Sequence, residues 1–150
     1  MLTLIRTDSE NPDFRNLVAL LDAELAERDG ADHSFYDQFN KIDQLRQVVV
    51  VYKNDVPVGC GAIKSYTDGI AEVKRMFVPL PYRRQGIAAM ALAELESWAA
   101  ESGYTGCILE TGKKQPEAIE LYHKLGYRNI PNYGQYAGVD NSVCMEKRLR

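Results

Sequence analysis

The segment at 70–110 constrains the fold of this 150-residue chain more than any other. An extended, mostly apolar run at 70–78 is followed by two prolines, which stop the strand and force a turn. A run built almost wholly of Ala, Leu, Met and Glu then predicts a helix over 87–102 that Gly103 ends. A further strand is expected at 105–110. Because a helix links two neighbouring parallel strands as a right-handed crossover, these strands should run parallel.

The other segments predict antiparallel strands and two more helices around this unit. Apolar runs at 47–53 and 56–66 flank Asn54-Asp55, which is typical of a hairpin, and 67–69 turns again into 70–78. Strands joined by such short turns must be antiparallel. The remaining predicted elements are a strand at 2–6, a helix that starts at Asn11-Pro12 or at Ser9 and runs to about Arg28, a helix from Pro116 to Gly126, and strands at 127–130 and 142–149. The sequence therefore predicts a single α/β domain over 1–150, a mixed sheet with helices on its faces.

Composition narrows the class of protein. The chain is 45% hydrophobic and 26% charged, which is ordinary for a globular protein. A formal charge of −3 and a pI near 5.4 indicate no general affinity for nucleic acid. No apolar run approaches the ~18 residues of a membrane span, and the N-terminus lacks the pattern of a signal peptide. We therefore expect a cytoplasmic protein that binds neither nucleic acid nor membrane.

The cysteines fit the same picture. Cys60, Cys107 and Cys144 are odd in number, far apart, and each lies inside a strand-like run. This spacing favours reduced core residues over a disulfide framework or a metal site. We expect no metal.

The turn before the helix at 87–102 has the features of an anion site. The first backbone N–H groups of a helix lack intrahelical partners and lie at the positive end of the helix dipole. Gly86 allows phosphates to approach the backbone closely, and Arg83 and Arg84 add positive charge. The turn is neither a P-loop nor a dinucleotide fingerprint. The local pattern predicts a phosphate or pyrophosphate site, and a solvated basic turn remains the alternative.

Two motifs carry a family resemblance. The run at 73–79 is followed by Arg83-Arg-Gln-Gly-Ile-Ala88, and farther on stands Gln115-Pro-Glu-Ala-Ile-Glu-Leu-Tyr-His-Lys-Leu-Gly-Tyr127. In this order and at this separation, the pair resembles the signatures of the GNAT superfamily of acetyl-CoA-dependent N-acetyltransferases. The resemblance extends over nearly the whole chain. It implies the family's fold, with mainly antiparallel N-terminal strands, a parallel and splayed central pair, and flanking helices.

The resemblance also implies acetyl-CoA as the cofactor and a set of residues that contact it. The backbone at 76–78 would pair with the pantetheine arm as an added strand does, and amides at 83–88 would hold the pyrophosphate. Gln115 departs from the Asn of many relatives, which changes the reach of its amide. The predicted contacts are Met76, Phe77, Val78, Arg83, Arg84, Gln85, Gly86, Ile87, Ala88, Gln115 and Ala118.

Acetyl transfer from acetyl-CoA to a primary amine, by direct attack in a ternary complex, needs a neutral nucleophile. A lysine-like amine with a pKa of about 10.4 loses roughly 4–5 kcal/mol to deprotonation at pH 7, whereas an α-amine with a pKa near 8 loses only about 1 kcal/mol. Glu72 is the candidate base, and strand alternation predicts that it shares a face with Lys74, Met76 and Val78. The alternative is an exposed glutamate paired across the sheet with a lysine. Glu110 is the second candidate for the base, or a residue that orients the acceptor.

Tyr122 is the candidate acid. The helix stripe that includes Ala118 and Leu121 can direct its phenol toward the gap between the splayed strands. The matching tyrosine of the family protonates the departing thiolate. The alternative is a core tyrosine anchored by a hydroxyl hydrogen bond. His123 follows on the helix, points about 100° away, and is expected on the surface.

The acceptor is the least constrained part of the prediction. The segment at 30–40 is interpreted as a lid that uses His33, Tyr36 and Gln38, or alternatively as a loop that places Phe35 and Phe39 in the core. The loop at 131–136, with Tyr133, is the other predicted wall. Carboxylates near the entrance favour a cationic small molecule, although solvation explains them equally well; they are Asp29, Asp32 and Asp37.

A rival function is a non-catalytic CoA-binding sensor of the same fold. Possession of both Glu72 and Tyr122 argues against it, because a binding module has no need of the pair. The resemblance also makes a homodimer possible, since relatives commonly dimerise.

Overall fold

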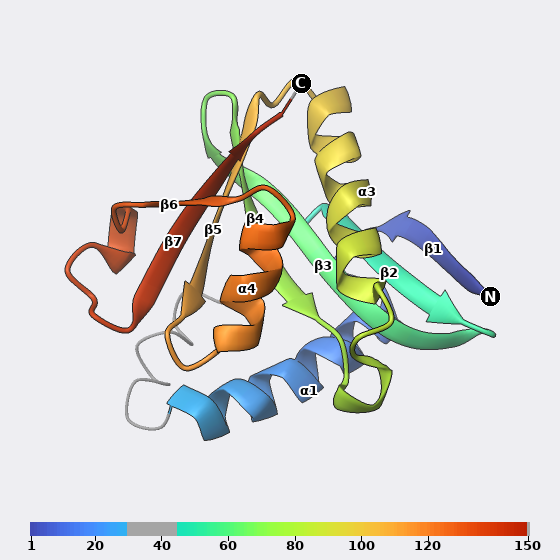
Figure 1. Ribbon diagram of the computed structural model, residues 1–150. Helices are drawn as coiled ribbons and strands as arrows, with labels where there is room; N and C mark the ends of the chain where they lie inside the picture. The colour runs from blue at the N-terminus through green and yellow to red at the C-terminus, as the bar shows by residue number, and fades with distance from the viewer. Residues whose placement is uncertain (30–44, 150) are drawn as a thin grey trace.

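The computed structural model describes residues 1–29 and 45–149, and its centre is one mixed seven-stranded sheet (Figure 1). Strand order across the sheet is β1-β2-β3-β4-β5-β7-β6. The strands are β1 (Leu2–Thr7), β2 (Gln47–Lys53), β3 (Val56–Thr67), β4 (Ile70–Phe77), β5 (Gly106–Gly112), β6 (Arg128–Ile130) and β7 (Ser142–Arg148). The helices are α1 (Pro12–Asp29), α3 (Ile87–Glu101) and α4 (Pro116–Lys124), with short 3-10 turns η2 (Leu80–Tyr82) and η3 (Gly134–Tyr136).

The strand directions confirm the predicted α/β architecture. Strands β1 to β4 pair antiparallel in chain order, and β7 pairs antiparallel with both β5 and β6. Strands β4 and β5 are parallel, because α3 carries the chain from the end of one back to the start of the other. Within the described ranges, no helix is both long and apolar enough to cross a membrane.

Helices cover both faces of the sheet, and alternating residues of β2 contribute to the two cores. Val49 and Val51 pack with the buried stripe of α3 on one face, which is the face in front in Figure 1. Val48 and Val50 pack with Phe14 and neighbouring apolar residues of α1 on the opposite face. A strand buried on both faces reads as a continuous apolar run, which is why 47–53 lacks alternation.

Local chemistry sets the ends of these elements. The Asn11 side chain accepts a hydrogen bond from the backbone N–H of Phe14 at 3.0 Å, so Asn11, and not the alternative Ser9, caps the N-terminus of α1. Asn54 and Asp55 both have positive φ, 51° and 70°, which is the geometry of a tight turn between β2 and β3.

The parallel pair separates soon after it forms. Pairing between β4 and β5 covers only Ile70–Glu72 against Gly106–Ile108, and no further residues of the two strands are in register. The rest of β4 and the rest of β5 diverge, which confirms the predicted splay. An opening in the sheet therefore lies between the carboxyl-terminal halves of the two strands.

A β-bulge in β4 corrects one expectation from strand alternation. Ala62 of β3 is in register with Lys74, but Cys60 is in register with Phe77, so β4 holds an extra residue at this point. Arg75 has a φ of +58°, the left-handed region. Its guanidinium reaches Asp22 of α1, whereas Met76 packs in the core beside α3.

The bulge changes which residues share a face with Glu72. Ala71 and Val73 belong to the core on the α3 face, so Glu72 and Lys74 lie on the α1 face, as alternation requires. After the extra residue, Met76 and Val78 return to the α3 face. The prediction that Glu72 shares a face with Met76 and Val78 is therefore wrong. Of the three predicted residues, only Lys74 lies on the same face as Glu72.

All three cysteines are buried free thiols, as the sequence predicts. Burial raises the pKa of Cys60 to about 12 and the pKa values of Cys107 and Cys144 to about 11. Neutral thiols are therefore favoured in the folded chain at neutral pH.

These shifts predict a loss of stability in alkali. The unfolded chain ionises its thiols above pH ~8.5, while the folded chain keeps their protons, so folding becomes less favourable as pH rises. Each thiol should steepen the loss by about 1.4 kcal/mol per pH unit between its unfolded and folded pKa values. We expect denaturant unfolding to give a lower free energy at pH 10 than at pH 8. The Cys107→Ala variant should show a shallower decline, and equal stability at the two pH values would contradict the prediction.

Candidate active site

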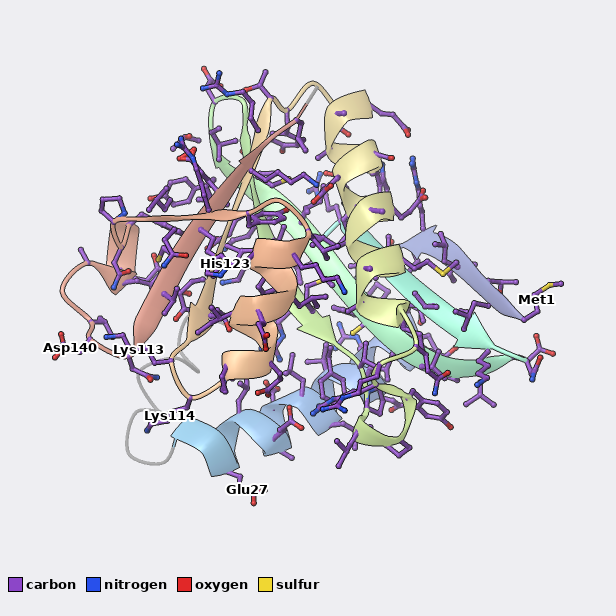
Figure 2. All side chains as sticks on the ribbon, viewed as in Figure 1. Met1, Glu27, Lys113, Lys114, His123 and Asp140 are labelled. Carbon is purple, nitrogen blue, oxygen red and sulfur yellow. The ribbon has the colours of Figure 1, made fainter. Side chains whose placement is uncertain are left out.

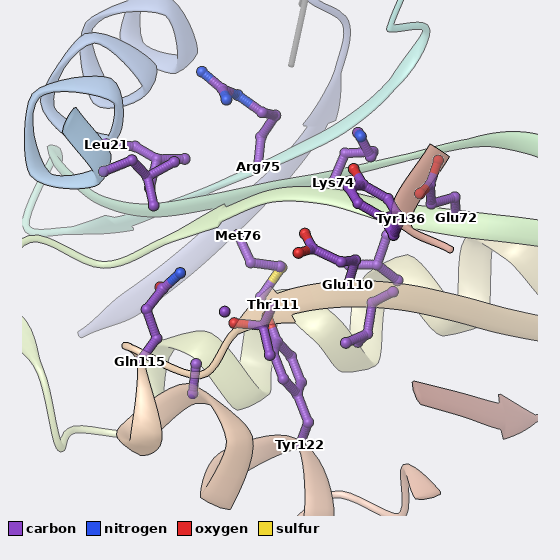
Figure 3. Close-up of a pocket in the computed structure, with 15 residues that line it drawn as sticks. Leu21, Glu72, Lys74, Arg75, Met76, Glu110, Thr111, Gln115, Tyr122 and Tyr136 are labelled. Carbon is purple, nitrogen blue, oxygen red and sulfur yellow. The ribbon is translucent and has the colours of Figure 1, made fainter. Parts of the chain in front are cut away.

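A cavity of about 120 Å³ lies where β4 and β5 separate (Figure 3). Strands β4 and β5 form two of its sides, and α1, α4 and η3 contribute the others. Its wall brings together six residues that the sequence singles out, namely Glu72, Met76, Glu110, Gln115, Ala118 and Tyr122. The remaining lining comes from Leu21, Leu25, Val73, Lys74, Arg75, Leu109, Thr111, Gly112 and Tyr136.

Glu72 is a buried carboxylate with a defined partner. Its residue is only 3% exposed, so it is not the solvated strand glutamate of the alternative interpretation. Lys64 stands opposite it in the β3 register and is exposed. The Tyr133 hydroxyl donates a hydrogen bond to Glu72 Oε2 at 2.8 Å. Burial and the adjacent Glu72 carboxylate raise the pKa of Tyr133, so this phenol remains a donor.

Three tyrosines form an aromatic wall beside that carboxylate. Tyr133 packs edge-on against Tyr66, with ring centroids 5.1 Å apart, and against Tyr136 at 5.7 Å. The loop at 131–136 therefore lies next to Glu72, where the sequence predicts a wall of the acceptor pocket. Tyr133, the predicted acceptor contact, bonds directly to the candidate base.

Tyr122 projects from α4 toward β5 and is 8% exposed (Figure 3). Its ring packs edge-on against Tyr127 with centroids 5.8 Å apart. Burial, with Glu110 nearby, raises the pKa of Tyr122, so the phenol keeps its proton at neutral pH. The described residues provide no hydrogen bond to its hydroxyl, unlike the core anchor of the alternative interpretation. The neighbouring His123 is exposed, as predicted, and its Nε2 lies 2.6 Å from Asn129 Oδ1 (Figure 2).

Sequence reasoning gave no role to two cations in the cavity wall. Lys74 is 7% exposed, and burial lowers its pKa, although Glu72 and Glu110 oppose that shift. The Arg75 side chain is 2% exposed and forms an ion pair with Asp22 at 2.5 Å. The available signal was two adjacent cations, two residues after Glu72, in a strand whose other residues are apolar.

Arg83 connects the turn before α3 to the end of β4 and to α1. Its Nε donates to the backbone oxygen of Val78 at 2.7 Å, and its Nη2 pairs with Glu24 of α1 at 2.7 Å. The guanidinium also lies over the Phe77 ring, 5.8 Å from the centroid. Glu24 offsets the charge that the sequence assigned to the mouth of the anion site. Arg84 is exposed, with a φ of +66°.

Gly86 gives the turn its open backbone. It stands at the N-cap of α3 with φ 80° and ψ 10°, and a Cβ placed there would meet nothing within 4 Å. No side chain caps the helix and no acidic residue lies in its first turn. Lys53 extends toward the turn and donates to Gln85 Oε1 at 3.0 Å. Free amides at a helix N-terminus beside an uncrowded glycine fit a diphosphate.

We predict that Gly86→Ala weakens CoA binding about tenfold or more. The methyl group would stand where a phosphate approaches, and the left-handed conformation is unfavourable for alanine by roughly 1 kcal/mol. Calorimetric titration of CoA measures the effect. Gly103→Ala is the matched control, because Gly103 also has a positive φ of 94° with nothing within 4 Å, at the far end of α3. Equal Kd values for the Gly86→Ala variant and the unmodified chain would contradict the prediction.

His33, Tyr36, Gln38, Phe35, Phe39, Asp32 and Asp37, and the side chain of Asp29, lie outside the described residues. Within the described part of the chain, no group of three or more His, Cys, Asp or Glu side chains is arranged to hold a metal ion.

Comparison with known proteins agrees with this geometry. The model of the acetyltransferase (GNAT) family matches residues 10–127. The chain belongs to the GNAT family. An IAA acetyltransferase of Azospirillum brasilense is 38% identical over 67% of this chain and 67% of its own length. A Klebsiella pneumoniae structure, described as a candidate acyl-CoA N-acyltransferase, has a TM-score of 0.84 at 29% identity over 100% of this chain and 99% of that one.

The fold is also that of solved acetyltransferases with their cosubstrate. A GNAT acetyltransferase of Elizabethkingia anophelis with acetyl-CoA bound has a TM-score of 0.72 at 17% identity, over 99% of this chain and 98% of that one. The protein is an acyl-CoA-dependent acetyltransferase, and acetyl-CoA is its cosubstrate.

Proposed function

We propose that this GNAT protein transfers the acetyl group of acetyl-CoA to the primary amine of a small molecule, by direct attack in a ternary complex. One observation carries the proposal. Glu72 and Tyr122 come from elements on opposite sides of the β4–β5 opening and line the same cavity. A group that accepts a proton and a group that holds one therefore face a common space.

The residues around the opening fit acetyl-CoA, which supplies an activated acetyl thioester when bound. Beyond Glu72 the β5-facing edge of β4 has no ladder partner within the described strands, so backbone groups at 76–78 are available to an extended chain. The turn at 83–88 would hold the diphosphate through its backbone N–H groups. Gln115 and Ala118 line the cavity from the α4 side.

Glu72 is proposed as the base that takes the proton of the amine. An amine with a pKa of about 10.4 needs roughly 4–5 kcal/mol to become neutral at pH 7, so a positioned carboxylate has a large effect for such acceptors. The Tyr133 hydroxyl holds the orientation of the carboxylate through a 2.8 Å hydrogen bond. Because Glu72 lies on the α1 face of the sheet, its carboxylate is directed away from the core beside α3 and toward the proposed acceptor.

Tyr122 is proposed as the acid that gives a proton to the departing sulfur. Its raised pKa keeps the phenol protonated until that point. A thiol with a pKa near 8.5 already leaves fairly well as a thiolate. Tyr122 should therefore accelerate the transfer without being indispensable.

A thiol-release assay with acetyl-CoA and a panel of amines tests the proposed function. We expect release of free CoA that depends on both the enzyme and the amine, and mass spectrometry should find the acetylated amine. CoA binding measured by calorimetry with no release for any amine would overturn the proposal. That outcome would favour the non-catalytic CoA-binding module.

A further inference from the structure

The cavity carries a second pair of charges that acetyl transfer itself does not use. Beside Glu72 and Glu110, its wall includes Lys74 and Arg75, which are adjacent on β4 and both buried. Alternation places Lys74 on the α1 side of the strand, the bulge places Arg75 on the same side, and Figure 3 shows both side chains rising from β4 on that side. Anionic and cationic groups thus face one small space.

Arg75 has a donor that the protein leaves unused. Its Nη2 donates to Asp22, but its Nε is a fully buried donor without a hydrogen-bond partner among the described residues. A guanidinium is always charged and donates in a planar fork that matches a carboxylate. Buried N–H groups without a partner are rare in folded proteins, and an acceptor atom of a bound molecule would complete the hydrogen bonding of this one.

The backbone conformation of Arg75 indicates that the fold holds this side chain in the cavity wall. A φ of +58° is unfavourable for a residue with a long side chain, and such residues cluster at active sites where the surroundings hold them in place. Without the extra residue, alternation would turn Arg75 toward the α3 core and away from α1. The positive φ of Arg75 therefore places its charged guanidinium in the cavity wall.

We propose that the acceptor is an amino acid, a small molecule with a primary amine and a carboxylate, and that Arg75 binds the carboxylate while the amine faces Glu72. This assignment rests on the proposed acetyl transfer and adds the substrate class. The carboxylates of Glu72 and Glu110 favour the cationic end of such a molecule, and Lys74 and Arg75 favour its anionic end. A diamine would instead place a second cation beside Arg75, which is electrostatically unfavourable.

The first experiment compares matched acceptors. Glycine, β-alanine, γ-aminobutyrate and 5-aminopentanoate are each assayed against their amides, with diaminobutane as a cationic acceptor. Removing the carboxylate lowers the pKa of the amine, so the amide is chemically the readier nucleophile, and any preference for the acid reports recognition. We expect kcat/KM to favour the acid about ten- to a hundredfold for at least one chain length. Amides or the diamine reacting as well as the acid at every length would overturn the proposal.

The second experiment assigns that preference to Arg75. In Arg75→Gln, the ratio of kcat/KM values for the acid and its amide should fall close to one. This ratio does not depend on how much of the variant is folded, because both acceptors report on the same active fraction. Asp22→Asn is the matched control, since it removes the ion pair but keeps the guanidinium, and it should retain the preference for the acid.

The possible outcomes distinguish a failure of the amino-acid assignment from a failure of the proposed acetyl transfer. An unchanged ratio in Arg75→Gln, or an equal loss of preference in Asp22→Asn, would overturn the role of Arg75. Release of CoA with amides and the diamine, without preference for acids, would overturn only the amino-acid assignment. No release with any acceptor would overturn the acetyl transfer and the amino-acid assignment together.

Discussion

The Glu72→Gln variant is expected to lose about 10²- to 10⁴-fold in kcat/KM for acetyl transfer. Glutamine has nearly the same shape but does not take up the proton of an ammonium group. Its side-chain oxygen can still accept the hydrogen bond that the Tyr133 hydroxyl donates to Glu72. Folding and CoA affinity should therefore change little. The measurements are steady-state thiol release and calorimetric titration of CoA.

The pH dependence sharpens this prediction. Without a base, only acceptor molecules that are already neutral can attack, so the rate of the variant should rise about tenfold per pH unit below the pKa of the amine. Glu110→Gln is the matched control, because Glu110 lines the same cavity from β5. A larger loss in Glu110→Gln than in Glu72→Gln would transfer the role of base to Glu110.

The Tyr122→Phe variant is expected to lose about ten- to a thousandfold in kcat, with CoA affinity unchanged. The loss is smaller than for the base, because a thiolate with a pKa near 8.5 departs without full protonation. Burial and Glu110 raise the pKa of Tyr122, so ionisation of this phenol should not change the wild-type rate as the pH is varied through the neutral range. Single-turnover kinetics with saturating acetyl-CoA isolates the step.

Tyr127→Phe is the matched control for that experiment. The Tyr127 hydroxyl donates to Glu96 Oε2 at 2.9 Å, and Tyr127 is not among the residues that line the cavity. Removing this hydroxyl should lower stability by about 1 kcal/mol and leave the rate near wild type. If both phenylalanine variants lose the same activity, Tyr122 acts through packing rather than as an acid.

Features that depend on short-range chemistry could be read from the chain alone. Helix α3, the hairpin turn at Asn54 and Asp55, and the turn with Gly86 before α3 each follow from residues within a few positions of one another. The parallel β4–β5 pair followed from the handedness of a helical crossover, which is nearly invariant. The two family motifs then identified the fold and the cosubstrate.

Contacts between distant segments settled the rest. Arg83 binds Glu24, Tyr133 binds Glu72, and Arg75 binds Asp22, over separations of 59, 61 and 53 residues. No local pattern encodes such partners, because they depend on how whole elements pack. The bulge at Arg75 is the clearest case. Arginine has no intrinsic preference for positive φ, so only the surrounding sheet and α1 hold it there, and that one extra residue determines which charges face the cavity.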